Sequence, residues 1–116
     1  MACDMSDDVK KFQLACDQLK VLEEESSLYY KLIDEEFNEF INSSTRIEEL
    51  DACMDLIWVI LGYCHARGFN VEGAWNEVAR SNMSKIDPET GKVKKREDGK
   101  VLKPATFSPP NLEPFI

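Results

Sequence analysis

Residues 28–41 read LYYKLIDEEFNEFI and residues 52–64 read ACMDLIWVILGYC, and these two stretches decide the fold. In the first stretch, apolar side chains recur every three or four positions, which predicts an amphipathic helix with one face turned to a core. The second stretch contains a single charged residue, Asp55, so it is predicted to be a helix packed on most of its sides. Two such neighbours indicate an all-α protein.

Carboxylates stand where these helices should be apolar. At about 100° per residue, Glu36 and Glu39 fall inside the apolar arc of the first helix, and Glu35 lies on its margin. Asp51 and Asp55 share one face of the next helix. Burying ionised carboxylates without partners costs on the order of several kcal/mol each, so either a positive charge compensates them or they stay protonated.

A cluster that offers only oxygen ligands suits a hard cation, and Mg²⁺ or Mn²⁺ is the expected occupant. Zinc is a poor alternative, because the chain has one histidine, His65, and no C-x-x-C pair. Acidic pairs at this spacing also occur on plain solvated helix faces. The interruption of apolar arcs on two consecutive helices favours the metal site over that alternative.

The rest of the chain completes one domain of 116 residues, with a helical bundle at 1–86 and a tail at 87–116. Ser6 is predicted to cap the first helix, and Gly68 to end the third. Periodicity and capping residues predict four main helices, at residues 7–22, 28–41, 46–67 and 71–83.

The tail is predicted to hold a weak hairpin around Asp98-Gly99, followed by an extended proline-rich end. Its apolar residues are expected to pack on a surface, either of this chain or of a neighbouring subunit. They are Phe107, Leu112, Phe115 and Ile116.

The composition and the charge limit the kinds of partner that the protein is expected to bind. The net charge of −8 disfavours wrapping of a nucleic-acid backbone. No basic region followed by an apolar one opens the chain, and no apolar stretch approaches the ~18 residues of a membrane span. The cysteines, Cys3 among them, are expected to be reduced thiols in a cytoplasm.

Helices apolar on so many sides, in so short a chain, suggest a homo-oligomer.

Residues 32–39 resemble the E-E-x-x-E motif of the MazG-like all-α NTP pyrophosphohydrolases, and residues 49–58 resemble the second acidic motif of that family. Many members have E-x-x-D in the second motif. Here Ala52 takes the glutamate position and Asp51 stands one residue earlier, as in the phage-type branch. With residues 77–85, the resemblance extends over nearly the whole chain.

The resemblance implies Mg²⁺-dependent cleavage of a nucleoside triphosphate to a monophosphate and pyrophosphate, with Mn²⁺ as a substitute ion. A purine deoxynucleotide such as dGTP is the implied substrate, and family members form dimers and tetramers. Glu36, Glu39 and Asp55 match the metal ligands. Glu35 and Asp51 match positions that ligate the ion or orient and deprotonate the attacking water.

Nucleotide contacts are implied at five further residues, each with an ordinary structural alternative. Contacts with the phosphates are expected from Lys31, Asn82 and Lys85. The alternative is that they are ordinary surface residues. Trp58 is expected to stack on the base or else to be core, and Gln13 to reach a base edge. A non-catalytic nucleotide-binding or adaptor module, and a helical interaction protein, remain alternatives for the whole chain.

Overall fold

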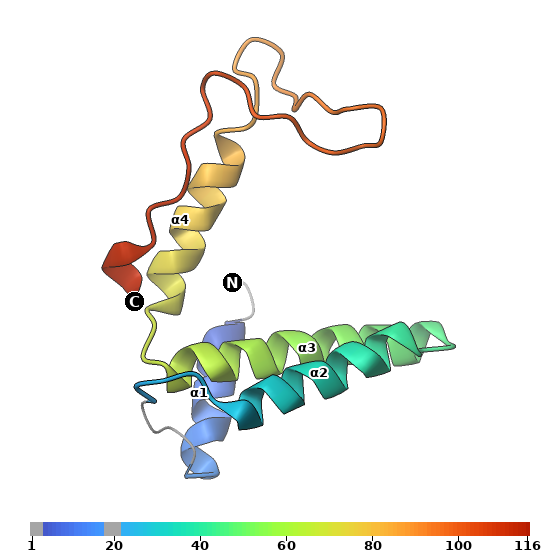
Figure 1. The fold of residues 1–116 in the computed structure, drawn as a ribbon, viewed down its shortest axis with the longest axis vertical. Helices are drawn as coiled ribbons and strands as arrows, with labels where there is room; N and C mark the ends of the chain where they lie inside the picture. Colours follow the sequence, from blue (N-terminus) through green and yellow to red (C-terminus); the bar gives the residue numbers. More distant parts are fainter. Residues whose placement is uncertain (1–3, 18–21) are drawn as a thin grey trace. The chain divides into compact units, whose positions relative to one another are not determined.

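The structure is a computed structural model that describes residues 4–17 and 22–116 of the chain (Figure 1). The prediction of an all-α protein with four main helices is confirmed. Within the described residues no strand occurs. The elements are α1 (Met5–Ala15), α2 (Ser27–Ile41), α3 (Arg46–Ala66), α4 (Val71–Met83) and a short 3-10 helix, η1 (Glu113–Phe115).

The chain forms two compact units, Met1–Val71 and Glu72–Ile116. The first contains α1, α2 and α3, and the second contains most of α4 together with the tail. None of the described helices combines the length and the hydropathy that crossing a membrane requires.

Helices α2 and α3 lie side by side and form the frame of the first unit (Figure 1). Thr45 caps α3 by accepting a hydrogen bond from the backbone N–H of Glu48 at 3.1 Å, as a threonine at that position favours. Beyond the other end, Gly68 adopts φ +75°, a conformation that costs glycine little and that ends the helix where expected. Local sequence signals therefore mark both ends of α3.

The start of α1 corrects one prediction. Asp4, rather than Ser6, is the N-cap residue, and its carboxylate accepts a hydrogen bond from the backbone N–H of Asp7 at 3.0 Å. Ser6 lies inside the first turn, where its hydroxyl contacts His65 instead. The helix ends at Ala15, earlier than predicted, and part of the predicted continuation, residues 18–21, lies outside the described residues.

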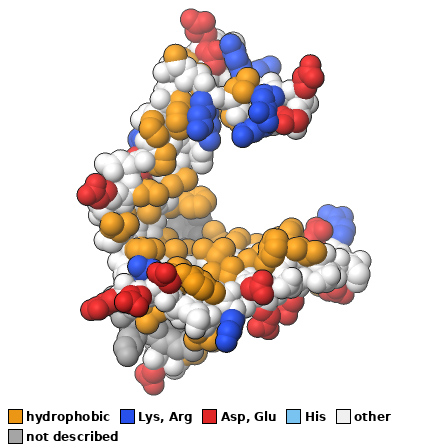
Figure 2. Space-filling view, viewed as in Figure 1, with side chains coloured by type: hydrophobic (Ala, Val, Ile, Leu, Met, Phe, Trp, Pro, Cys, Tyr) orange, Lys and Arg blue, Asp and Glu red, His pale blue; other side chains and the backbone are white. Residues whose placement is uncertain are grey.

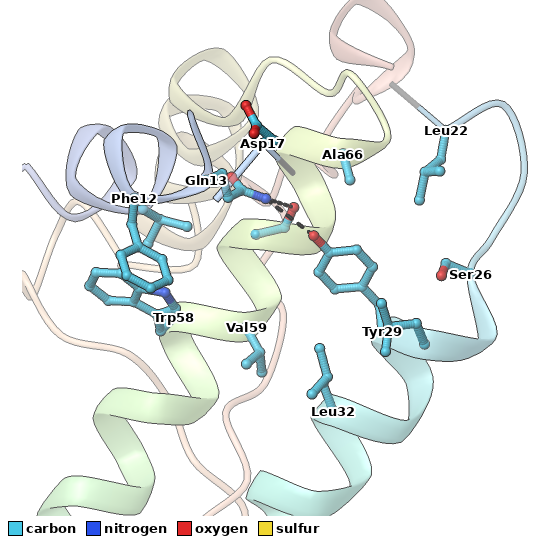
Figure 3. Close-up of a pocket in the computed structure, with 13 residues that line it drawn as sticks. Phe12, Gln13, Asp17, Leu22, Ser26, Tyr29, Leu32, Trp58, Val59 and Ala66 are labelled. Atoms are coloured by element: carbon cyan, nitrogen blue, oxygen red, sulfur yellow. Dashed lines mark hydrogen bonds between the residues drawn. The ribbon is translucent and has the colours of Figure 1, made fainter. Parts of the chain in front are cut away.

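Helix α1 is held to α3 by a buried polar network (Figure 3). The amide nitrogen of Gln13 donates to the carbonyl oxygen of Gly62 at 2.9 Å and to the hydroxyl of Tyr29 at 3.2 Å. The amide oxygen of Gln13 can only accept, so the Nδ1 of His65, 3.1 Å away, carries the proton of this contact. The Nε2 of His65 then accepts from the Ser6 hydroxyl at 2.8 Å. One glutamine therefore links three helices.

Much of the apolar surface of the described residues is exposed. Val9, Ala52 and Ala66 are the buried hydrophobic residues among them. Figure 2 shows hydrophobic side chains gathered along the α2–α3 hairpin on the face in view. A surface of this kind is typical of a protein that contacts a partner.

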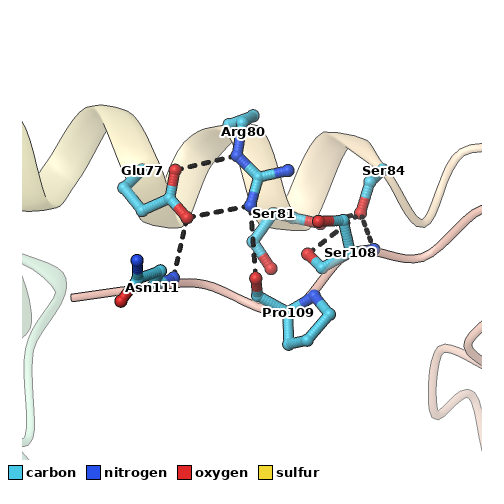
Figure 4. A network of polar contacts seen from close by, with 7 residues as sticks. All are labelled: Glu77, Arg80, Ser81, Ser84, Ser108, Pro109 and Asn111. Atoms are coloured by element: carbon cyan, nitrogen blue, oxygen red, sulfur yellow. Dashed lines mark hydrogen bonds and ion pairs between the residues drawn. The ribbon is translucent and has the colours of Figure 1, made fainter. Parts of the chain in front are cut away.

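In the second unit the proline-rich tail runs along α4, held by polar contacts (Figure 4). The Glu77 carboxylate pairs with Arg80 at 2.8 Å and accepts from the backbone N–H of Asn111 at 2.7 Å. Arg80 also donates to the Pro109 carbonyl at 3.2 Å, and Ser84 accepts from a tail backbone N–H at 2.9 Å. The tail is thus anchored by hydrogen bonds to one helix.

The predicted hairpin is reduced to a single antiparallel bridge between Lys95 and Val101. Gly99 has φ +89°, which suits glycine and supports the turn between them. Ile116 is 80% exposed within the chain, so its expected apolar contact, on this chain or on a neighbouring subunit, stays a prediction. The hydrogen bonds with α4, rather than this terminal side chain, position the tail.

Candidate metal centre

Three carboxylates from two helices meet in the first unit. Glu36 and Glu39 are three residues apart on α2, which places them one above the other on the same face. Asp55 reaches the same point from α3, which lies alongside. One carboxylate oxygen from each of the three lies within 4.8 Å of the other two.

Glu36 is the carboxylate of this cluster whose surroundings most disfavour its charged form. Its Oε2 atom is buried and has no hydrogen-bond partner among the described residues. Burial raises the pKa of Glu36 to about 7, with a further rise from its hydrogen bond to Glu39 and from the neighbouring carboxylates. Burial likewise raises the pKa of Asp55, and the charges of Asp51 and Glu39 add to that effect. Without a cation, the folded protein therefore resists full ionisation of the cluster.

The residues fit a hard divalent cation. Mg²⁺ takes oxygen ligands at about 2.0–2.1 Å, so two oxygens on one ion lie at most about 4.2 Å apart. The three carboxylate oxygens, within 4.8 Å of each other, need only small side-chain rotations to reach that spacing. A cation would also compensate the unpaired oxygen of Glu36.

Glu35 and Asp51 lie next to the cluster but outside the group of three. Glu35 raises the pKa of Glu36 by its charge, and Asp51 does the same to Asp55. Asp51 and Glu39 line a common hollow of about 290 Å³. Both outer carboxylates are exposed, so they are accessible to a water molecule or a ligand beside the cluster.

Glu48 lines the same hollow and was missed from the sequence. Its carboxylate accepts from the backbone N–H of Ser44 at 3.2 Å, in an arrangement close to a capping box. The signal was present, because Glu48 follows Thr45 by three residues at the start of a helix. Its position therefore has a structural explanation.

A cavity of about 370 Å³ opens between α1, α2 and α3 (Figure 3). The rings of Phe12 and Trp58 meet there edge to face, with centroids 5.6 Å apart and an interplanar angle of 75°. The lining is mostly apolar. It consists of Val9, Phe12, Gln13, Asp17, Leu22, Ser26, Leu28, Tyr29, Leu32, Trp58, Val59, Gly62 and Ala66.

The two predicted base contacts both line this cavity. Trp58 is 39% exposed, so part of its ring is open to a ligand. Gln13 is only 3% exposed and already bonds to Gly62, Tyr29 and His65. A base edge could be read by Gln13 only if one of those hydrogen bonds were exchanged.

The predicted phosphate contacts belong to both units of the chain. Lys31 is exposed on α2 in the first unit. Asn82 and Lys85 belong to the second unit, where the Lys85 ammonium donates to the Asn82 side-chain oxygen at 3.0 Å. Lys85 also lies 5.8 Å from the centre of the Phe107 ring.

Comparison with known proteins adds one finding. Residues 15–82 match the family described as phosphoribosyl-ATP pyrophosphohydrolase, and this span includes all five predicted metal-site carboxylates. No curated protein matches the chain. The family match supports a pyrophosphohydrolase that acts on a nucleotide, and it covers more than half of the chain. The chain therefore belongs to the phosphoribosyl-ATP pyrophosphohydrolase family, an all-α family of the MazG-like superfamily.

Proposed function

We propose that the protein hydrolyses a nucleoside or deoxynucleoside triphosphate to the monophosphate and pyrophosphate, with Mg²⁺ held by Glu36, Glu39 and Asp55. One observation carries the proposal. Three carboxylates converge within 4.8 Å, and one buried oxygen among them has no hydrogen-bond partner in the part of the chain that the structure describes. The family match gives the same general class of reaction.

When bound, a divalent ion at this cluster supplies charge neutralisation for the phosphates and a lower pKa for a coordinated water. In this proposal Glu35 and Asp51, whose carboxylates are exposed, orient the attacking water and accept its proton. The water oxygen forms a bond to the α-phosphorus, and the bond from that phosphorus to the oxygen bridging to the β-phosphorus breaks. Pyrophosphate leaves with that bridging oxygen, and the proton passes to the carboxylate.

The cavity beside α1 is the proposed base site. Its volume of about 370 Å³ and its aromatic rim suit a flat heterocycle, which would contact the exposed part of Trp58. Gln13, Asp17, Ser26 and Tyr29 are the polar residues of the lining. Among purines, dGTP is the proposed substrate, a preference that rests on the resemblance of the sequence to phage-type members.

Phosphoribosyl-ATP is a second candidate substrate, favoured by the description of the matched family. A pyrophosphohydrolase cleaves it at the same kind of bond, the bond from the α-phosphorus to the oxygen that bridges to the β-phosphorus. The other alternative is a non-catalytic nucleotide-binding module. Ala52, buried where many relatives of the MazG-like type carry a glutamate, is the observation that favours it.

A panel assay separates these candidates. Each ribo- and deoxynucleoside triphosphate, and phosphoribosyl-ATP, is incubated with Mg²⁺, with Mn²⁺ or with EDTA, and the products are resolved by chromatography. Monophosphate and pyrophosphate that disappear with EDTA are the expected result, with dGTP turned over fastest. Diphosphate and phosphate would contradict the assigned bond, and no turnover of any substrate would favour the binding module.

A further inference from the structure

The cavity between α1, α2 and α3 has a single charged residue among the described residues of its lining. That residue is Asp17, which lies just beyond the end of α1 (Figure 3). The rest of this lining is apolar apart from Gln13, Ser26 and Tyr29. A ligand that enters the cavity therefore meets an apolar surface and one negative charge.

The Asp17 carboxylate is available to a ligand, whereas the neighbouring amide is already engaged. The side-chain nitrogen of Gln13 donates to Gly62 and Tyr29. Its oxygen contacts the His65 ring. The Asp17 carboxylate is exposed, and no side chain in the part of the chain that the structure describes pairs with it. Both of its oxygens can therefore accept hydrogen bonds from a ligand.

The backbone of Asp17 restricts which residues suit this position. Alone among the described non-glycine residues it has a positive φ, +55°. Its N–H donates to the Leu14 carbonyl at 3.2 Å, which closes the end of α1. Glycine, asparagine and aspartate adopt this left-handed conformation at the lowest cost. The carboxylate can therefore be removed by Asp17→Gly or neutralised by Asp17→Asn while the end of the helix is kept.

A carboxylate distinguishes bases by their hydrogen-bond donors, because an ionised carboxylate can only accept. On the Watson–Crick edge of guanine, N1–H and the N2 amino group lie side by side, and both donate. Adenine and cytosine each present one amino group beside a ring nitrogen that accepts. Thymine presents one N–H between two carbonyl oxygens. Guanine is thus the base that offers two adjacent donors, and the other bases bring an acceptor against the negative charge.

We propose that Asp17 selects guanine, by accepting hydrogen bonds from N1–H and the N2 amino group of a base that contacts Trp58. The inference rests on the cavity being the base site of the proposed function, but it requires neither a metal ion nor hydrolysis. Local periodicity could not assign this role, because it predicted a helix through residue 22, whereas α1 ends at Ala15.

The first experiment measures the binding of dGMP and dIMP by calorimetry in EDTA, so that neither metal nor hydrolysis takes part. Hypoxanthine keeps the N1–H of guanine and lacks only its N2 amino group. The wild type is expected to bind dGMP about 10-fold more tightly, the low end for a hydrogen bond to a charged group, because Asp17 is exposed. Asp17→Gly is expected to bind the two equally. Asp34→Asn, exposed on α2 and outside the cavity lining, should keep the wild-type ratio.

The second experiment reverses the hydrogen-bond pattern with Asp17→Asn. An asparagine amide has one acceptor and one donor, which match the N6 amino group and the N1 atom of adenine. The ratio of kcat/KM for dGTP over dATP, measured with Mg²⁺, is expected to fall by about 10-fold or more, with an absolute gain for dATP. A gain on one substrate cannot result from loss of folding. Asp34→Asn is again the control, since it makes the same chemical change outside the cavity.

Equal affinity of the wild type for dGMP and dIMP, binding of neither, or a preference that persists in Asp17→Gly overturns the proposal. Asp17 would then serve only to end α1. These results are distinct from failure of the proposed function. A protein that distinguishes dGMP from dIMP through Asp17 but hydrolyses no triphosphate keeps the base site and loses the enzymatic assignment. Hydrolysis with a dGTP-to-dATP ratio that Asp17→Asn leaves unchanged keeps the enzyme and overturns the role of Asp17.

Discussion

Glu36 and Asp55 each bring one carboxylate to the proposed metal site, and each has an isosteric amide replacement. Glu36→Gln or Asp55→Asn is expected to lower the rate of pyrophosphate release by roughly 100-fold, the upper end of what even outer-shell changes cost at metal sites. Folding should not suffer, because each change removes repulsion from a crowded acidic cluster. Asp34→Asn, on the exposed side of α2, is the control. A folded Asp55→Asn protein with wild-type turnover contradicts the ligand assignment.

The raised pKa of Glu36 predicts how stability changes with pH when metal is absent. The folded-state pKa is about 7 and the ordinary value is 4.5, so between those values the folded state binds a proton that the unfolded state has lost. The Glu36 contribution to the free energy of unfolding therefore falls as pH rises from about 4.5 to about 7, and then levels off. Melting temperatures in EDTA should show this fall in the wild type and lack it in Glu36→Gln. Parallel pH profiles for the two proteins would refute the assignment.

Some of these residues could be predicted from local periodicity and some could not. The inward position of Glu36 and Glu39 follows from 3.6 residues per turn and needs no tertiary information. Gln13 bonds to residues 49 and 52 positions away, and no local pattern specifies such partners. The orphaned oxygen of Glu36 likewise depends on how α2 and α3 pack, which sequence spacing leaves open.

Helix α1 depends on its contacts with α3, because an isolated helix of 11 residues is marginal in water. Gln13→Ala leaves the Gly62 carbonyl and the His65 N–H without their buried partner. The expected loss is about 1–3 kcal/mol in the free energy of unfolding, measured by urea denaturation. Lys11→Ala, on the exposed side of α1, should change it by a few tenths at most.

The same variant also tests the base-site hypothesis. If Gln13 reads a base edge, Gln13→Ala changes the ratio of kcat/KM between purine and pyrimidine substrates as well as the stability. A loss of stability with an unchanged ratio assigns Gln13 a structural role only. Asp17 and the aromatic contact of Phe12 with Trp58 would then be the remaining candidates for selecting the base.

The predicted ends of α2, α3 and α4 agree with the structure to within one residue, whereas the start of α1 does not. The accurate ends coincide with strong local signals, such as Thr45 before α3 and Gly68 after it. At the start of α1 two capping residues, Asp4 and Ser6, compete. The contact of Ser6 with His65, 59 residues away, is specific to the tertiary structure and could not enter a local prediction.

The molecule as a whole has a net charge of −8 and the proposed triphosphate ligand is itself an anion, so the proposed binding needs an intermediary positive charge. Composition indicates this requirement but not its location. The location follows from two adjacent helices that turn acids toward each other. Periodicity does not specify the distance between this site and Lys85 of the second unit. That distance depends on how the two compact units are arranged.

Metal binding should therefore stabilise the entire first unit. An ion that binds only the folded state at 100 times its Kd adds about 2.7 kcal/mol to the free energy of unfolding, or roughly 10 °C in Tm for a chain of this size. Mn²⁺ is expected to raise the Tm of the wild type by about that amount at pH 8, and by much less at pH 5, where Glu36 is protonated.

The double variant Glu36→Gln with Glu39→Gln should lose this effect, while Glu23→Gln with Glu24→Gln, in the exposed segment before α2, should keep it. Both doubles remove two negative charges, so a difference between them cannot come from net charge. Equal stabilisation of the two would mean that Mn²⁺ binds elsewhere. No stabilisation of the wild type would leave the cluster as an acidic contact between helices and would favour the helical interaction protein.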